Sequence, residues 1–95
     1  MYVVIARYVV QPGQEDAVEA ALRAMTPLSL AEPGCLLYQP HRAVHDASVF
    51  VIYEGYENEA AYLAHTETEH FARYVVNDAV PRLVSRERAF LTSLE

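Results

Sequence analysis

Two kinds of hydrophobic spacing divide the first third of the chain. Residues 2–10, YVVIARYVV, are β-branched or aromatic at most positions, and a Pro-Gly pair follows them, which predicts a strand and then a turn. From about Glu15 the apolar residues recur at intervals of three and four, which predicts an amphipathic helix. Pro27 should kink or end this helix early, before the Glu-Pro-Gly turn at residues 32–34. The apolar positions of the helix are Val18, Ala21, Leu22, Met25 and Leu28.

The middle of the chain returns to strand-like patterns. Residues 35–44, CLLYQPHRAV, and residues 48–57, SVFVIYEGYE, are rich in aliphatic and aromatic side chains, and a short polar stretch joins them. Pro40 has no backbone N–H to contribute to a sheet, so the first of these strands should lie at an edge or contain a bulge.

The last third predicts two helices and a strand. Asn58 is a good N-cap for a short helix over residues 59–65. Thr66, followed three positions later by Glu69, has the spacing of a capping box, so a new helix is expected to start at Thr66. Residues 86–94 can form a final strand. One face of the second helix is apolar and consists of Phe71, Tyr74, Val75, Ala79 and Leu83.

The resulting order, β-α-β-β-α-β, is that of an α+β ferredoxin-like fold, with a four-stranded antiparallel sheet and helices on one face. The first strand, however, is apolar on both faces and is interrupted on the second face only by Arg7. Two helices can cover only one face, and soluble monomers rarely expose a large apolar patch. The pattern therefore predicts a homodimer in which two sheets pack together.

Composition limits the functions that need to be considered. The 95 residues predict one domain, residues 1–95, and 53% hydrophobic against 21% charged residues is typical of a folded globular protein. A net charge of −6 argues against nucleic acid and membrane surfaces as partners. Cys35 is the only cysteine, and no signal peptide or long apolar run is evident, so we expect a cytoplasmic protein.

His65 and His70 are the most suggestive polar pair. On one continuous helix, five steps would turn their rings about 140° apart, but a break at Thr66 would let both rings face one space. The end of one helix should then favour a cationic His65, and the start of the next a neutral His70. No metal site is expected, because zinc normally needs a third protein ligand. The remaining candidates, His41, His45, Glu54 and Cys35, show no recognisable ligand spacing.

Two stretches carry a family resemblance. EPGCLLYQPHR at residues 32–42 and FVIYEGYENEAAYLAHTETEHF at residues 50–71 resemble the antibiotic biosynthesis monooxygenase family of dimeric α/β barrels. That family typically has a Glu-Pro-Gly-Cys turn and an Ala-His-x-x-x-x-His-Phe segment, and the likeness extends from about Val3 to Val80. Tyr56 replaces a common tryptophan. The haem-degrading branch has a histidine in the helix after the His-Phe pair, where this chain has none, so haem degradation is disfavoured.

The resemblance implies a monooxygenase that oxidises a small hydroxylated aromatic compound or quinol with molecular oxygen and without metal, flavin or other cofactor. In that interpretation His70 is the base, and His65 and Tyr53 orient the substrate or stabilise its oxyanion. Two alternatives remain open: a non-catalytic dimeric ligand-binding module, and an isomerase or aldolase-like enzyme that uses the same histidines. The residues expected to contact substrate, unless they are simply core aromatics, are Tyr38, Tyr62, Phe71 and Tyr74.

Overall fold

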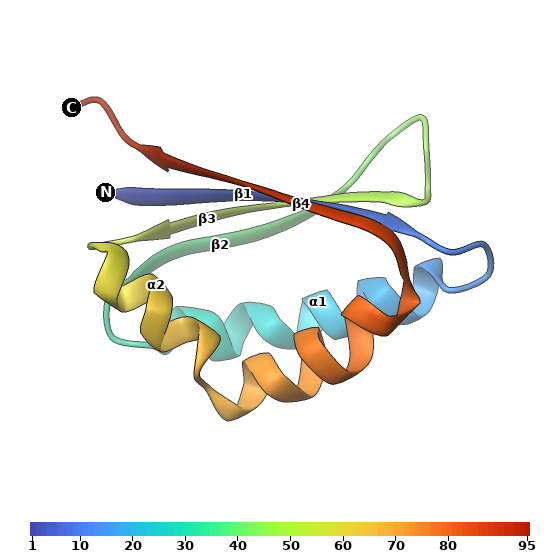
Figure 1. The fold of residues 1–95 in the computed structure, drawn as a ribbon, viewed down its shortest axis with the longest axis horizontal. Helices are drawn as coiled ribbons and strands as arrows, with labels where there is room; N and C mark the ends of the chain where they lie inside the picture. Colours follow the sequence, from blue (N-terminus) through green and yellow to red (C-terminus); the bar gives the residue numbers. More distant parts are fainter.

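Two layers, a sheet and a layer of helices beneath it, make up the structure (Figure 1). The computed structural model describes all 95 residues. Its elements are β1 (Tyr2–Val10), α1 (Glu15–Leu30), β2 (Cys35–Arg42), β3 (Val49–Tyr56), α2 (Glu59–Thr66), the π-helix η1 (Phe71–Ala79), the short 3-10 helix η2 (Val80–Arg82) and β4 (Leu83–Thr92).

The sheet has the strand order β2-β3-β1-β4, and every neighbouring pair is antiparallel. This confirms the predicted ferredoxin-like α+β fold. β2 forms one edge, as the position of Pro40 suggested, and its pairing with β3 shifts between Cys35 and Leu37. β4 starts at Leu83 and ends at Thr92, whereas the sequence predicted a strand over residues 86–94.

Alternation along β1 and β3 decides which side chains reach the helices. On the helix side, β1 contributes Val4, Ala6, Tyr8 and Val10, all of which are buried. They pack with the apolar face of α1, which is formed by Val18, Ala21, Leu22 and Met25. The opposite face of the sheet has no helix over it (Figure 1) and still carries aliphatic residues such as Val3, Ile5 and Val51.

Pro27 lies inside α1, which continues to Leu30, so of the two predicted effects, a kink or an early end, the early end is wrong. The last turns of the helix remain ordered because Met25 and Ser29 are buried. Tertiary packing here outweighs the hydrogen bond that proline removes.

The predicted break between the two histidines is present, one or two residues later than expected. α2 ends at Thr66, and helical structure resumes at Glu69. Thr66 is not the N-cap, because its Oγ1 donates to the Leu63 carbonyl at 2.7 Å. Instead, Thr68 Oγ1 accepts a hydrogen bond from the Phe71 N–H at 3.1 Å. The proposed capping box is therefore wrong in register, although its consequence, a new helix, is confirmed.

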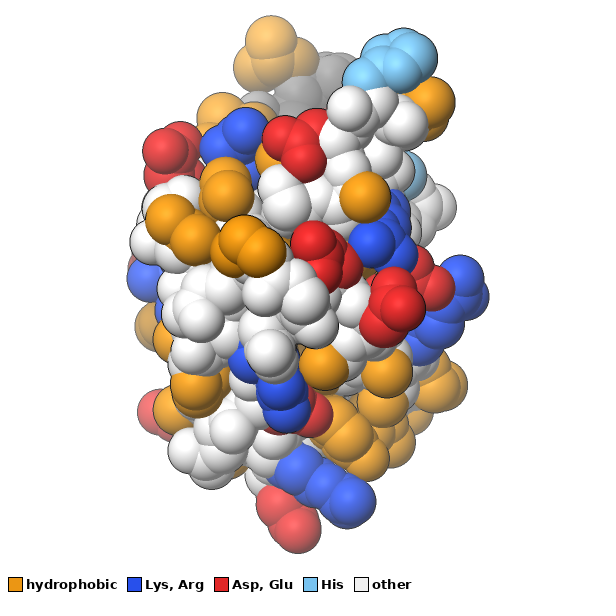
Figure 2. All heavy atoms as spheres, turned by 90° about the vertical axis from the view of Figure 1, so that its right-hand side faces the viewer, with side chains coloured by type: hydrophobic (Ala, Val, Ile, Leu, Met, Phe, Trp, Pro, Cys, Tyr) orange, Lys and Arg blue, Asp and Glu red, His pale blue; other side chains and the backbone are white.

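The surface at the end of the molecule that carries the β1–α1 turn is mixed in character. Charged side chains of both signs are interspersed there with hydrophobic ones, and neither sign dominates this face (Figure 2). None of the helices combines the length and the hydrophobicity that crossing a bilayer requires.

Candidate functional site

Three separate elements bring one carboxylate and two imidazoles together. Glu32 lies in the turn after α1, His65 in the last turn of α2, and His70 in the helical segment that follows the break. His65 Nδ1 is 2.9 Å from Glu32 Oε2 and 3.1 Å from Oε1, and His70 Nε2 is 2.5 Å from Oε2. The predicted convergence of the two rings is confirmed, and Glu32 is the group they share.

The Glu-Pro-Gly turn holds Glu32 against α2. Gly34 has a φ of +84°, a conformation that residues with a Cβ rarely adopt. A Cβ at this position would lie 2.8 Å from Ala61 Cβ, so the turn can approach α2 this closely only with glycine. The Glu57 N–H also donates to the Gly34 carbonyl at 2.9 Å, which ties the turn to the end of β3.

His65 is 1% exposed, and aromatic rings surround it. Burial lowers its pKa below the usual value, and the Glu32 carboxylate opposes that shift only in part. The expectation of a cationic His65 is therefore wrong, because desolvation outweighs the favourable helix end. Since a carboxylate only accepts, neutral His65 donates its Nδ1–H to Glu32 and leaves Nε2 unprotonated.

Glu54 lies on the other side of His65. It is buried on β3, accepts the Tyr56 hydroxyl hydrogen bond at 2.7 Å, and places Oε1 3.8 Å from His65 Nε2. Burial raises the pKa of Glu54 to about 7, against the opposing effects of Tyr56 and of Arg86 and Arg88. Glu54 on the sheet, His65 on α2 and Glu32 in the turn after α1 thus form a continuous row of titratable side chains between the sheet and the helices.

The aromatic residues expected at the site lie around the histidines. Ring centroids of Tyr38, Tyr62 and Phe71 are 5.7, 6.3 and 5.2 Å from that of His65. Tyr74 lies beside His70 in an open hollow of about 330 Å³. The residues lining this hollow, which we call the His70 hollow, are Leu28, Glu69, His70, Arg73 and Tyr74.

Tyr53 is the exception. It pairs with Ile5 and Gln39, on the face of the sheet that points away from the helices, whereas the adjacent Glu54 points towards them. The prediction that Tyr53 acts beside the two histidines is wrong, because neighbouring strand residues face opposite sides of a sheet.

The sequence analysis did not identify several residues near the site. Arg86 lies over the Tyr8 ring at 5.8 Å, and its Nε is buried without a hydrogen-bond partner. Arg88 Nη1 donates to the Tyr62 hydroxyl at 3.1 Å. Glu32 could have been suspected from its place in the Glu-Pro-Gly turn, but no spacing rule connects it with histidines 33 and 38 residues away.

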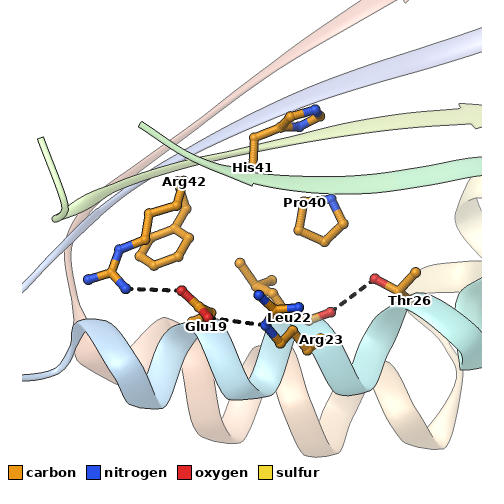
Figure 3. Close-up of a pocket in the computed structure, with 8 residues that line it drawn as sticks. Glu19, Leu22, Arg23, Thr26, Pro40, His41 and Arg42 are labelled. Carbon is orange, nitrogen blue, oxygen red and sulfur yellow. Dashed lines mark hydrogen bonds and ion pairs between the residues drawn. The ribbon is translucent and has the colours of Figure 1, made fainter. Parts of the chain in front are cut away.

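A second hollow, of about 200 Å³, lies between α1 and β2 (Figure 3). Its charged groups bind one another: Arg42 Nη1 is 3.0 Å from Glu19 Oε1, and Arg23 Nε is 3.1 Å from Glu19 Oε2. His41 lies at its edge and contacts the Val51 carbonyl. Because its charged groups are already paired with one another, this hollow is a weaker candidate for a ligand-binding site than the His70 hollow.

The Glu32 cluster also has the composition of a metal site. Glu32, His65 and His70 each offer one ligand atom, and these atoms all lie within 4.8 Å of one another. No metal site was expected from the sequence because the two histidines had no recognisable third ligand. Glu32 supplies a third ligand atom in the structure.

Known proteins resemble the chain over most of its length. The antibiotic biosynthesis monooxygenase family matches residues 1–77. A Mycobacterium tuberculosis protein, named provisionally as a monooxygenase, is 32% identical over 71 residues, which are 75% of this chain and 69% of that protein.

Solved structures agree with the sequence match. A Pseudomonas aeruginosa protein is 36% identical, with a TM-score of 0.89 over 99% of this chain and 94% of its own. A Nitrosomonas europaea protein, described provisionally as an antibiotic biosynthesis monooxygenase, is 26% identical, with a TM-score of 0.93 over 98% and 89% of the two chains. This chain belongs to the antibiotic biosynthesis monooxygenase family.

Proposed function

We propose that the protein is a monooxygenase that oxidises a small hydroxylated aromatic compound or quinol with molecular oxygen, without a bound cofactor. The observation that carries this proposal is the contact between His70 and Glu32 at the edge of the His70 hollow. A carboxylate that accepts from one imidazole nitrogen fixes the ring and its tautomer, which suits the other nitrogen to act as a base.

The proton transfer can be assigned to atoms. Because Glu32 accepts from Nε2–H of His70, the lone pair of the neutral ring is on Nδ1, which has no protein hydrogen-bond partner. Nδ1 takes the phenolic proton of the substrate. The phenolate then gives one electron to oxygen, and the resulting phenoxyl radical and superoxide combine through a new C–O bond at a ring carbon that carries hydrogen. The peroxide anion takes back the proton held on Nδ1 of His70, which regenerates the base. The hydroperoxide then loses water, whose hydrogens include that of the oxygenated carbon, and yields a quinone.

The walls of the hollow suit an electron-rich ring. Tyr74 and Leu28 offer aromatic and aliphatic surface, and the Arg73 guanidinium lies over the Tyr74 ring at 4.9 Å. Arg73 forms no ion pair with a carboxylate of the chain, so its charge is available to stabilise a phenolate. His65 acts through Glu32 as a positioning residue.

Oxygen uptake tests the proposal. Metal-free protein is mixed with a panel of benzo- and naphthohydroquinones, and consumption is compared with that of the His70→Asn variant. We expect kcat to fall by about 10²-fold or more with little change in KM, because a base acts mainly in the transition state. His45→Asn, on the exposed 43–48 loop, is the matched control.

Three outcomes separate the alternatives. Uptake that does not exceed autoxidation with any substrate contradicts the monooxygenase. Binding of a hydroquinone without turnover favours a non-catalytic module, and conversion without oxygen uptake favours an isomerase.

We also propose that two copies associate through the face of the sheet that has no helices. Support comes from the aliphatic and aromatic side chains on that face of the central strands, over which no helix lies. Burying such a surface in a second copy would remove it from water. The partly exposed residues concerned include Ile5, Val9, Val51 and Tyr53.

A further inference from the structure

We propose that Glu32, His65 and His70 form a binding site for one divalent transition-metal ion. This inference goes beyond the proposed oxidation, which needs no metal. Two neutral imidazoles and one carboxylate are the ligand set of many catalytic zinc sites and of non-haem iron sites. The three ligands come from three different elements, so the complete set exists only in the folded protein.

The distances suit an ion placed between these groups. Metal–ligand bonds of about 2.0–2.2 Å hold neighbouring ligand atoms roughly 3–3.5 Å apart. The Glu32 oxygens are 2.9 and 3.1 Å from His65 Nδ1, close to that range. His70 Nε2, at 2.5 Å, would have to withdraw by about half an ångström, and its side chain is 20% exposed and has room to do so.

Charge favours a cation at this position. The Glu32 side chain is only 10% exposed, and its only ionic contacts are the two histidines. No arginine reaches it. A buried carboxylate without a permanent cationic partner is costly, and a bound dication would remove that cost.

The surroundings match what bound imidazoles require. A histidine that ligates metal through one nitrogen usually donates the other N–H to a carboxylate or carbonyl. With Nδ1 on the metal, the Nε2–H of His65 would face Glu54 Oε1, which is 3.8 Å away and would have to approach by more than half an ångström to accept it. Glu54 is itself held by the Tyr56 hydroxyl. His70 also lines its hollow, so the three ligands lie next to space that water can occupy.

Metal binding and the proposed proton transfer exclude each other. Nδ1 of His70 can accept a proton only while Nε2 carries the hydrogen. An ion on Nε2 displaces that hydrogen, so that Nδ1 of the neutral ring becomes the N–H and has no lone pair to offer. A bound metal should therefore inhibit the oxidation, and a chelator should restore it.

Calorimetry with Zn²⁺ on the chelator-treated, dialysed 95-residue protein tests the site without any substrate. We expect about one ion per chain, and Co²⁺ should give the visible absorption bands of a low-coordinate complex. His70→Asn and Glu32→Gln should weaken Zn²⁺ binding by roughly 100-fold or more, because changes to outer-sphere groups alone cost 10–100-fold.

Two other histidines provide control variants. His41→Asn and His45→Asn remove exposed histidines outside the cluster and should leave the affinity unchanged. Circular dichroism of the metal-free variants checks folding, and if Glu32→Gln does not fold, His70→Asn at its partly exposed position decides the question. Absence of saturable binding, or binding that these two substitutions leave intact, overturns the proposal. Oxygen uptake by metal-free protein remains a separate test of the oxidation.

Discussion

At the level of single residues, the Glu32 side chain accepts hydrogen bonds from both His65 and His70, so one carboxylate fixes the orientation of two rings. We expect Glu32→Gln to lower the kcat of hydroquinone oxidation by about 10²-fold or more in metal-free protein, since an amide can no longer select the right tautomer. Steady-state oxygen uptake measures this. Glu67→Gln, at an exposed position in the break between the two helices and outside the hollow, should have little effect, and equal losses in both variants would count against the role of Glu32.

Cys35 gives a second prediction at this scale. Burial raises the pKa of its thiol to about 11, with contributions from the Glu32 and Glu54 carboxylates. The thiol is therefore protonated, and only a thiolate reacts with iodoacetamide, so labelling at pH 8 should be about 100-fold slower than for an unfolded cysteine. Mass spectrometry with and without urea tests this. Rapid labelling of folded protein would show that the thiol is accessible or ionised.

Residue by residue, the sequence predicted part of the site. The convergence of His65 and His70 followed from a local signal, the break between their helices. Glu32 did not, because its contact with the histidines depends on how the turn packs against α2. The prediction that placed Tyr53 at the site was wrong because both faces of β3 are apolar. Alternation alone could therefore not show whether Tyr53 or Glu54 faces the helices.

At the scale of elements, the order of strands and helices was predictable, while their ends were not. The spacing of apolar residues and the turn residues identify each helix and strand. The residue at which a helix begins depends on which of several polar side chains caps its first N–H groups. In the sequence Thr66 has the capping-box spacing to Glu69 and Thr68 has no such partner, yet only Thr68 caps the second helix. The extent of β4 depends on its pairing with β1, and the continuation of α1 past Pro27 depends on the burial of its last turns. Neither can be seen in the local sequence.

The cap supports a test of this element. Thr68→Ala removes the acceptor of the Phe71 N–H and the donor to the His65 carbonyl. We expect a loss of about 1 kcal/mol in the free energy of unfolding, which urea denaturation measures. Thr66→Ala, at the last residue of α2, should cost clearly less. If Thr66→Ala is the more damaging substitution, the original capping box is correct.

The turn that carries Glu32 gives a matched pair of glycine substitutions. Gly13 and Gly34 have φ values of +88° and +84°, but a Cβ at Gly13 meets nothing within 4 Å. Gly13→Ala should cost about 1 kcal/mol from backbone strain alone. Gly34→Ala should cost roughly 1–3 kcal/mol more, because its Cβ would press on Ala61. Thermal and urea unfolding compare the two variants, and equal losses would mean that the turn does not pack tightly on α2.

At the scale of the whole molecule, the uncovered face of the sheet leads to the proposed homodimer. Light scattering at micromolar concentration should give twice the mass of one chain. Val51→Asp, in the middle of this face, should yield monomer or destabilised protein because a dimer would bury its unpaired charge. Val44→Asp, at a loop position that is 91% exposed, should remain a dimer. A stable monomer of the unmodified protein would refute the association.

The two outer strands of the sheet also affect how the protein behaves when crowded. β4 pairs only with β1 and has ten residues, and an open strand of that length can recruit further strands into fibrils. Arg86, Glu87 and Arg88 occupy its centre, where stacking identical chains in register would set like charges above one another. On the opposite border, Pro40 in β2 lacks the N–H that an incoming strand would need. Both edge strands therefore resist fibril growth. Replacing the three charged residues of β4 with threonine should make the protein form fibrils more readily.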